Sequence, residues 1–268
     1  MSDRKKLIIV GVLALQGSYH EHLAHLTSLF EDLSNDKEYN LKYEFESREV
    51  KKVEDLDSLN GLILPGGEST TMSILLQRNG LLEALKRLIQ IDKLPCWGSC
   101  AGLILLCNEI TNTNIDLSGK NVEKSMRYKS IGGLDVRVHR NSFGRQLDSF
   151  SEKFTLENFD GELHNAEFTC VFIRAPVIKD VLSLETRQPE EAPHSDTENR
   201  IVRATYIGDI VNRAKPEVLL RLGSNEKDSM IVAIRQGNVF GTSFHPELVK
   251  GDYRMHKWFI DRFILDSI

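Results

Sequence analysis

Hydrophobic and polar positions divide the chain into two alternating kinds of segment. Residues 7–15 (LIIVGVLAL) and 59–64 (LNGLIL) contain the continuous apolar run of a strand that is buried on both faces. Residues 20–33 (HEHLAHLTSLFEDL) instead place apolar side chains at helical spacing. Strands that alternate with helices predict an α/β fold, a three-layer domain whose mostly parallel sheet is flanked by helices.

The remainder of the chain continues this pattern. A helix that is broken at Gly80 is expected in residues 71–90, and residues 94–110 are expected to form a strand, a turn and a helix. The other expected elements are strands within residues 41–48, 131–150, 167–178, 217–222 and 229–248, and a closing amphipathic helix over residues 255–268.

Three polar stretches interrupt the pattern, near residues 34–40, 108–128 and 185–215. They lack the apolar side chains that a core requires, and strand-like sequence resumes after each of them. We therefore interpret them as surface insertions within one domain, residues 1–268, and not as domain boundaries.

Composition removes several function classes. The net charge is −5, whereas nucleic-acid-binding proteins usually carry a basic patch. The four cysteines form no CxxC pair, lack the spacing of a zinc site and are too sparse for a secreted disulfide scaffold. The sequence therefore predicts free thiols in a reducing compartment, the cytoplasm, with neither nucleic acid nor a membrane as a partner.

The first residues admit two interpretations. Residues 1–18 begin with basic side chains and continue with a short apolar run, which imitates a signal peptide. Residues 7–15 are far too few to span a bilayer as a helix, and a buried parallel strand has the same composition. The sequence that follows is typical of a turn and a helix start, so the strand is favoured.

Residues 98–102 (GSCAG) have the form of a nucleophile elbow, with Cys100 between two glycines. A sharp strand-to-helix turn crowds the neighbouring positions and pushes the central side chain out of the end of the sheet, into solvent or substrate. The helix N-terminus favours the reactive thiolate, and the amide of Ala101 is a candidate oxyanion donor. The other cysteines lack this frame and are expected to be small buried hydrophobes: Cys96, Cys107 (on the same helix as Cys100) and Cys170.

Residues 241–248 (GTSFHPEL) supply a base for the thiol. Pro246 restricts His245 to an extended backbone, and residues two apart in an extended segment project to the same side. Glu247 can then orient the imidazole, which completes a triad of nucleophile, base and carboxylate. The remaining histidines lack such a frame, and surface or structural roles are expected for them: His20, His22, His25, His139, His164, His194 and His256.

Residues 64–70 (LPGGEST) form a glycine-containing loop between a strand and a helix. Its backbone amides can approach a ligand closely, and the start of the helix favours negative charge. A phosphate cradle would need the lysine of a Walker loop or the G-x-G-x-x-G pattern, and the sequence has neither here. A site for an oxyanion or a carboxylate is therefore favoured.

The motifs LPGGEST, GSCAG and SFHPE, in this order on an alternating α/β chain, resemble those of the class I glutamine amidotransferases, which have a flavodoxin-like fold. Within that class, GVLALQGSYHEH, PGGESTTM, RNSFGRQLDSF and FIRAP are similar to segments of the glutaminase subunits of pyridoxal 5′-phosphate synthases. The resemblance spans nearly the whole chain. It implies a hydrolase that converts L-glutamine to L-glutamate and ammonia through a γ-glutamyl thioester, for vitamin B6 biosynthesis.

The resemblance also implies a role for each matching residue. Cys100 would be the nucleophile, His245 the general base and acid, and Glu247 the third member of the triad. The amides of Gly67 and Ala101 would form the oxyanion hole. The residues that would bind the substrate glutamine are Gly67, Glu68, Ser69, Arg140, Ile173 and Arg174.

A protein partner is implied as well, and no metal or organic cofactor. Ammonia released into neutral water is quickly protonated and loses its nucleophilicity, so a partner must receive it directly. In the family this partner is the synthase subunit, a TIM-barrel protein with which the glutaminase forms a hetero-oligomer. Gln16 would lie near the oxyanion site at the contact between the two subunits.

Two other functions stay open at this point. A related glutaminase could feed another pathway, such as histidine or tryptophan biosynthesis, although RNSFGRQ and LQG favour the pyridoxal branch. The chain could also be a non-catalytic binding protein on the same fold, since a fold alone does not determine function. The presence of all three triad residues argues against the second alternative.

Overall fold

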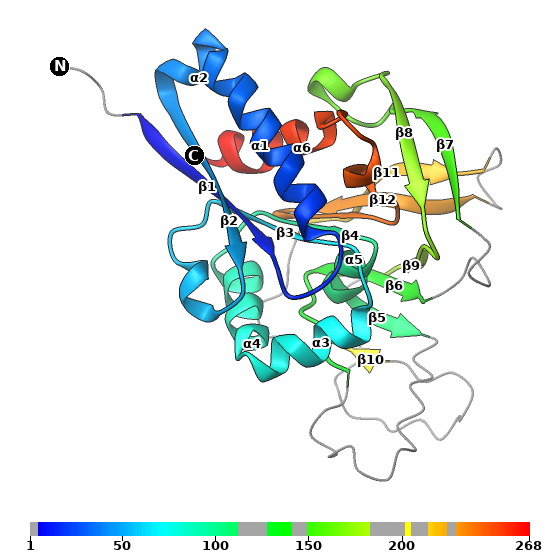
Figure 1. The fold of residues 1–268 in the computed structure, drawn as a ribbon. Coiled ribbons are helices and arrows are strands. Elements are labelled where there is room, and N and C mark those ends of the chain that lie inside the picture. Colours follow the sequence, from blue (N-terminus) through cyan, green and yellow to red (C-terminus); the bar gives the residue numbers. More distant parts are fainter. Residues whose placement is uncertain (1–4, 112–127, 141–148, 183–201, 205–213, 224–228) are drawn as a thin grey trace, which may run out of the picture.

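A parallel sheet forms the centre of the computed structural model, which describes residues 5–111, 128–140, 149–182, 202–204, 214–223 and 229–268 (Figure 1). Five strands of this centre lie side by side in the order β2-β1-β3-β4-β13 and all run in the same direction. The continuous apolar runs become the inner strands, while β2, with its alternating polar residues, lies at the edge. Their bounds are β1 (Lys6–Leu13), β2 (Tyr43–Val50), β3 (Gly61–Leu64), β4 (Cys96–Ser99) and β13 (Val239–Thr242).

Beyond β13 the sheet continues with mixed strand directions, a feature that the hydrophobic pattern does not encode. In this half β12 is antiparallel to β13, β11 and β9, whereas β5 and β6 are parallel to each other. A separate antiparallel hairpin of β7 and β8 lies beside it (Figure 1). The bounds are β5 (Cys107–Thr111), β6 (Leu134–His139), β7 (Phe150–Thr155), β8 (Glu167–Phe172), β9 (Val177–Val181), β10 (Val202–Arg203), β11 (Glu217–Leu222) and β12 (Met230–Gln236).

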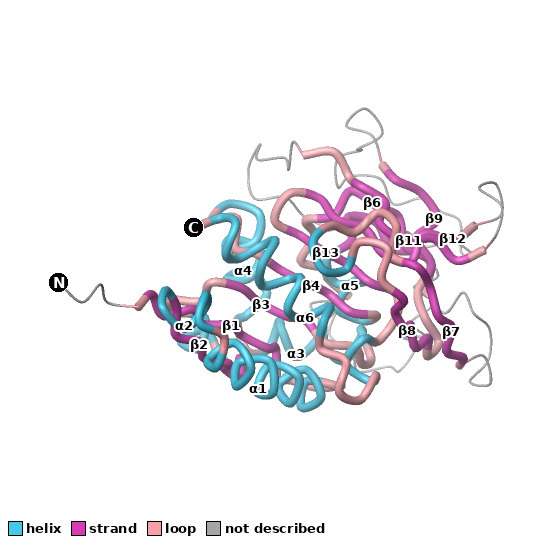
Figure 2. Tube along the Cα trace, turned by 90° about the horizontal axis from the view of Figure 1, so that it is seen from above, coloured by secondary structure: helices cyan, strands magenta, loops and turns pink. Residues whose placement is uncertain are grey.

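Helices cover both faces of the parallel centre, so the predicted three-layer α/β class is confirmed (Figure 2). One face carries α1 and α6, and the other carries α3, α4 and α5. The helix bounds are α1 (Tyr19–Asn35), α2 (Lys37–Lys42), α3 (Ser69–Arg78), α4 (Leu81–Lys86), α5 (Ala101–Leu106) and α6 (Arg254–Phe259). The expected break at Gly80 separates α3 from α4, because this residue has a φ of 71° that favours glycine.

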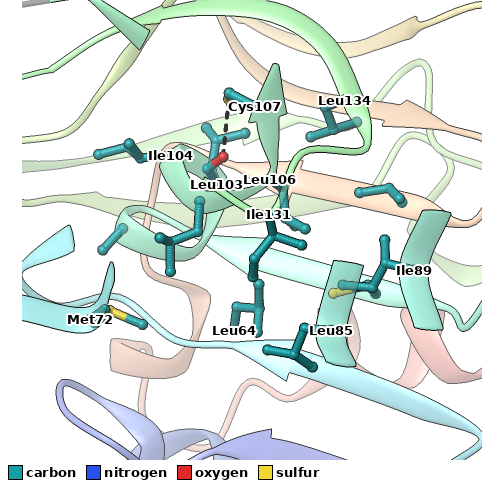
Figure 3. Close-up of a cluster of buried hydrophobic side chains, with 14 of the residues drawn as sticks. Leu64, Met72, Leu85, Ile89, Leu103, Ile104, Leu106, Cys107, Ile131 and Leu134 are labelled. Atoms are coloured by element: carbon teal, nitrogen blue, oxygen red, sulfur yellow. Dashed lines mark hydrogen bonds between the residues drawn. The ribbon is translucent and has the colours of Figure 1, made fainter. Parts of the chain in front are cut away.

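The face that carries α3, α4 and α5 is closed by a dense apolar cluster (Figure 3). Leu64 of β3, Leu85 of α4 and Leu103 of α5 have no exposed surface. Burying side chains of this size stabilises the fold by about 1.5–3 kcal/mol each. This packing fixes α5, and therefore the turn that precedes it, against the ends of the strands.

The helix predicted through residue 110 is wrong in its extent. The helix α5 ends at Leu106, and Cys107 begins the strand β5, which pairs with β6. A short apolar run is compatible with a buried helix or a buried strand, so periodicity could not separate the two here. Cys107 is nevertheless fully buried as expected, and its thiol donates to the Leu103 carbonyl at 3.0 Å (Figure 3).

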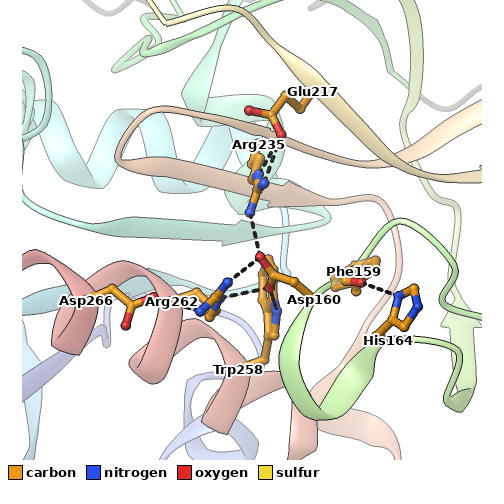
Figure 4. A network of polar contacts seen from close by, with 8 residues as sticks. All are labelled: Phe159, Asp160, His164, Glu217, Arg235, Trp258, Arg262 and Asp266. Atoms are coloured by element: carbon orange, nitrogen blue, oxygen red, sulfur yellow. Dashed lines mark hydrogen bonds and ion pairs between the residues drawn. The ribbon is translucent and has the colours of Figure 1, made fainter.

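Asp160, in the connection between β7 and β8, ties that connection to the C-terminal helical segment (Figure 4). Its carboxylate accepts hydrogen bonds from Trp258 Nε1 at 2.7 Å and from the Arg262 guanidinium at 2.7 and 2.9 Å. Arg235 of β12 lies 3.6 Å from the same carboxylate. Burial raises the pKa of Asp160, but these donors and cations outweigh it, and the pKa is lowered. The network anchors the hairpin whose second strand, β8, leads into the candidate site.

The closing amphipathic helix is present, as α6 followed by a π-helical segment (Ile260–Ile264) and a final 3-10 turn (Leu265–Ser267). Of the predicted insertions, residues 34–40 form the end of α1 and most of α2 and are largely exposed. Most of the stretches near 108–128 and 185–215 lies outside the described residues. No helix in the described part of the chain is long and apolar enough to cross a membrane.

Candidate active site

The turn at residues 98–102 joins β4 to α5, as the glycine frame predicts. Cys100 has φ 47° and ψ −99°, a conformation that side-chain-bearing residues rarely adopt. Its amide donates to the Thr242 carbonyl at 2.8 Å, which holds the turn against β13. A Cβ atom on Gly102 would lie 2.0 Å from the Leu64 carbonyl oxygen, and one on Gly98 would lie 2.4 Å from the backbone of Gly102. Both positions therefore require glycine.

The exposure of the thiol differs from the expectation. Cys100 is 7% exposed, so the residue is nearly buried and the turn does not present the sulfur to open solvent. Its Sγ atom lies 4.0 Å from the Ile173 carbonyl oxygen, at the point where the chain leaves β8. The predicted residues Cys100 and Ile173 are therefore brought together, although they come from distant parts of the sequence. The other three cysteines are fully buried, and all four are free.

His245 and Glu247 lie together behind the thiol. His245 Nδ1 is 2.8 Å from Glu247 Oε1, and the imidazole lies close enough to the Cys100 side chain for the two to interact electrostatically. Burial lowers the pKa of His245, but its interactions with Cys100 and Glu247 outweigh burial and raise the pKa to about 10. The structure thus favours a protonated imidazole between the Cys100 side chain and the Glu247 carboxylate.

His245 and Glu247 come together through a different backbone conformation from the extended segment that the sequence predicted. Pro246–Leu248 is a 3-10 turn, and not an extended segment, with the Leu248 amide 3.3 Å from the His245 carbonyl oxygen. Proline is favoured at the first position of a helical turn, where its missing N–H leaves no partner unpaired. The turn brings the Glu247 carboxylate back toward its neighbour two residues earlier. The His245 amide donates to the Val171 carbonyl of β8 at 2.8 Å, which fixes the start of the turn.

Glu247 is 3% exposed and is held by more than the imidazole. Ser18 Oγ donates to its Oε1 atom at 2.6 Å. Burial raises the pKa of this carboxyl, but His22, His245 and the Ser18 hydroxyl outweigh it and lower the pKa to about 2. The carboxylate therefore remains ionised in a nearly dry environment.

The loop after β3 gathers several other predicted residues. The Glu68 amide donates to Gln16 Oε1 at 2.9 Å, so the first strand-to-helix turn lies directly against the loop. The Glu68 carboxylate caps α3, since it accepts from the Thr70 amide at 3.0 Å. Arg140 Nη2 lies 3.4 Å from Glu68 Oε1 and 3.0 Å from Thr70 Oγ1. Gln16, Glu68 and Arg140 thus converge at the N-terminus of α3.

The remaining predicted residues lie on the loops and helix ends that border this site. Gly67 is inside the loop, next to the Gln16 carboxamide. Ser69 and Ala101 are the first residues of α3 and α5. Arg174 follows β8, is exposed and has a φ of 43°.

Three polar residues at the site were not singled out in the sequence: Ser18, His22 and Ser99. His22 is fully buried, and its Nε2 atom lies 3.1 Å from Ser99 Oγ and 3.4 Å from Glu247 Oε2. One signal was available, because His22 falls on the same buried face of α1 as Leu26 and Leu29. A histidine on an otherwise apolar helix face needs a polar partner inside the protein.

These groups have the arrangement of a nucleophile, a base and an orienting carboxylate, which is suited to acyl transfer from an amide. Within the described residues, no cluster of three or more histidine, cysteine or acidic side chains could hold a metal ion.

Known proteins resemble the chain over nearly its whole length. A model of the SNO glutamine amidotransferase family matches residues 12–204 and 194–265. Pyridoxal 5′-phosphate synthase subunit SNO1 of Saccharomyces cerevisiae is 36% identical over 260 residues, which cover 97% of this chain and 95% of that protein. Pyridoxal 5′-phosphate synthase subunit PdxT of Rhodococcus opacus is 38% identical over 255 residues, which cover 94% of this chain and 96% of that protein. A solved structure described as a glutamine amidotransferase aligns with a TM-score of 0.63 at 32% identity, over 94% of this chain and 97% of the other.

Proposed function

The chain belongs to the SNO glutamine amidotransferase family, and from this premise we propose that it is the glutaminase subunit of a pyridoxal 5′-phosphate synthase. It would hydrolyse L-glutamine and deliver the ammonia to a synthase subunit for vitamin B6 biosynthesis. The observation that carries this proposal is a chain of interactions among three nearly buried residues: His245 interacts electrostatically with Cys100 and lies 2.8 Å from the carboxylate of Glu247. Few arrangements other than a nucleophile and its base explain such a chain at a strained turn.

In this mechanism the Cys100 thiolate attacks the side-chain carbonyl carbon of glutamine, and the carbonyl π electrons move to oxygen. The tetrahedral oxyanion then collapses, the C–N bond breaks, and His245 transfers its proton to the departing ammonia. A γ-glutamyl thioester remains on the sulfur. The same imidazole takes a proton from water, which attacks the thioester to release glutamate and restore the thiolate. Glu247 keeps the imidazole oriented during both proton transfers.

Two backbone amides would stabilise the oxyanion, those of Gly67 and Ala101. The positions of the two residues support this role. Gly67 is in the loop after β3, and Ala101 is the first residue of α5, directly after the nucleophile. Loss of one such donor lowers the rate by about two to three orders of magnitude. The Gln16 carboxamide accepts a hydrogen bond from the amide of Glu68, the residue after Gly67. Gln16 would therefore connect the loop that carries Gly67 to the contact with the synthase subunit.

The α-amino and α-carboxylate groups of glutamine would be held by polar groups around the start of α3. Glu68 is suited to the ammonium group, and Arg140 is suited to the carboxylate. Their mutual contact at 3.4 Å supports a site in which both charges are already balanced before the substrate arrives. Ser69, Ile173 and Arg174 would complete the glutamine site.

The partner we propose is a TIM-barrel synthase subunit that forms a hetero-oligomer with this chain. The names of the relatives, which are subunits of pyridoxal 5′-phosphate synthase, support a complex of this kind. Direct transfer keeps ammonia unprotonated until it reacts. Four free cysteines support a reducing location, and we place the protein in the cytoplasm.

The experiment that tests the proposal measures ammonia and glutamate released from L-glutamine, with and without the synthase subunit. Release is expected with the partner, and Cys100→Ala is expected to lower it by about 10⁴-fold or more. Cys96→Ala, a matched change at the start of β4, the strand that leads into the turn, is expected to keep the activity because that thiol is fully buried in the core. Equal release by wild type and Cys100→Ala would refute the mechanism, and co-purification with a different synthase would assign another pathway.

A further inference from the structure

Three buried histidines lie behind the triad, and the mechanism above uses none of them. His22 and His25 belong to α1, and His256 belongs to α6. His22 and His256 have no exposed surface, and both rings pack against Trp97, with centroids 5.4 and 4.9 Å from that of the indole. An imidazole in such surroundings loses its hydration, so burying its nitrogen atoms costs free energy unless the protein supplies hydrogen-bond partners.

Both ring nitrogens of His22 have polar neighbours. Nε2 faces Ser99 Oγ at 3.1 Å and Glu247 Oε2 at 3.4 Å, and Nδ1 faces His256 Nε2 at 2.9 Å. Glu247 Oε2 has no hydrogen-bond partner among the described residues, so the 3.4 Å approach of His22 Nε2 is the polar contact recorded for this oxygen. The imidazole of His22 therefore lies between the triad and a second, fully buried imidazole.

The position of the proton on His22 follows from its neighbours. Burial lowers its pKa to about 4 in spite of the opposing effect of Glu247, so the ring is neutral at neutral pH and carries one N–H. A carboxylate can only accept, so a lone pair on Nε2 would repel Glu247 Oε2. The proton therefore sits on Nε2, and Nδ1 accepts from the N–H of His256 Nε2. The lone pair of His256 then falls on Nδ1, which has no partner in the described part of the chain.

We propose that His22 is a positioning residue of the triad: its Nε2–H, oriented by His256, is hydrogen bonded to the hydroxyl of Ser99 and lies against the Oε2 side of the Glu247 carboxylate, which keeps that carboxylate in place. The inference rests on the proposed function, because it assigns a role relative to that triad. Ser99 immediately precedes the nucleophile, so one imidazole contacts both the carboxylate and the strand end that leads into the strained turn.

The contacts of Glu247 show what this imidazole adds. Ser18 and His245 both hold Oε1, at 2.6 and 2.8 Å, and neither contacts Oε2. The contact with His22 restrains this second oxygen and so adds to the resistance against rotation of the carboxylate about the Cγ–Cδ bond. A rotated carboxylate would no longer accept from His245 Nδ1 in line, and the imidazole would lose the orientation that proton transfer requires. An apolar side chain of similar volume would fill the space but would leave Oε2 against hydrocarbon.

Two isosteric variants separate positioning from packing. The amide of glutamine reaches the place of Nε2, whereas that of asparagine reaches only the place of Nδ1. His22→Gln therefore retains the donor toward Glu247, and His22→Asn loses it. His25→Asn is the matched control, because His25 is also on α1 and 8% exposed but makes no hydrogen bond or ion pair with Glu247 or Ser99 in the described residues.

The measurements are kcat and KM for glutamine in the complex with the synthase, and the alkylation rate of the chain alone by iodoacetamide. The alkylation reports on Cys100, since the other three thiols have no exposed surface. His22→Asn is expected to lower kcat by about 10–100-fold, with KM within about twofold, and to slow alkylation. His22→Gln and His25→Asn are expected to stay within about threefold of wild type in both measurements.

The inference would be overturned if His22→Asn were alkylated at the wild-type rate. It would also be overturned if His22→Gln and His22→Asn lost kcat to the same extent. If the wild-type complex releases no ammonia, the proposed function fails, while the alkylation series still decides the role of His22. If His22→Asn does not fold, nitrogen NMR of the wild-type imidazole decides instead. The Nε2–H tautomer is expected at neutral pH, and the Nδ1–H tautomer would overturn the inference.

Discussion

The strained backbone of Cys100 leads to a prediction about stability that is independent of any assay of activity. The residue has φ 47° and ψ −99°, whereas Cys107, seven residues later and equally part of the core, has φ −72°. Both cysteines can be replaced by alanine, which keeps the Cβ atom, and by glycine, which removes it. Only at position 100 does the loss of Cβ relieve strain, because glycine readily adopts positive φ.

The magnitude follows from comparing the two positions. At Cys107 the change from alanine to glycine should lower the free energy of unfolding by about 1–2 kcal/mol, through greater freedom of the unfolded chain and the loss of a buried methyl group. At Cys100 the same cost is opposed by strain relief of about 1–3 kcal/mol. The glycine variant at position 100 should therefore be about as stable as its alanine counterpart, or more stable.

Urea denaturation of the four variants, followed by circular dichroism at pH 7, measures both differences. The alanine-to-glycine cost should be smaller at position 100 than at position 107 by about 1–3 kcal/mol. None of these comparisons depends on the nucleophile, since both variants at position 100 lack the thiol. An equal cost at the two positions would show that the backbone of Cys100 stores no strain, and would refute this reasoning.

Two further predictions concern charge in the site. The pKa of Glu247 is about 2 in the folded protein, against an ordinary value of 4.5, so its carboxylate contributes stability that is fully present above pH 4.5 and is lost as the pH falls toward 2. Glu247→Gln should flatten the decline of the urea midpoint between pH 4.5 and pH 3, and parallel declines would contradict this. Arg140→Ala should raise KM for glutamine by about 10–100-fold with little change in kcat, because it removes the charged partner proposed for the α-carboxylate. Arg140→Lys should recover part of the loss, and an unchanged KM in steady-state kinetics would exclude Arg140 from the glutamine site.

Much of the fold can be predicted from local patterns in the sequence. The apolar runs that become β1, β3 and β4 and the helical spacing of α1 require no knowledge of distant contacts, because each reflects burial of one segment. The elbow is local only in part: the crowding at Gly98 comes from Gly102, four residues later, whereas that at Gly102 comes from Leu64 of β3. The two-residue spacing of His245 and Glu247 is local too, although a 3-10 turn and not an extended strand brings them together.

Strand direction beyond β13 and the helix-to-strand change at Cys107 depend on which neighbour pairs with each segment. A run of buried residues has the same composition in a parallel strand, an antiparallel strand or a short buried helix, so local composition cannot distinguish these structures. The same limit applies to the polar residues around the triad. Ser18 and Glu247 are 229 positions apart, and His22 and His256 are 234 apart.

The sequence by itself determined the class of fold, the strand-to-helix bend at Cys100 and the proximity of His245 to Glu247, because periodicity, glycine placement and short spacing can be recognised within a few residues. Only the tertiary structure decided that the first turn of α1 and the start of α6 lie behind Glu247. Those contacts arise from the packing of helices on a common sheet, and hydrogen bonds between distant segments leave no periodic trace in the chain.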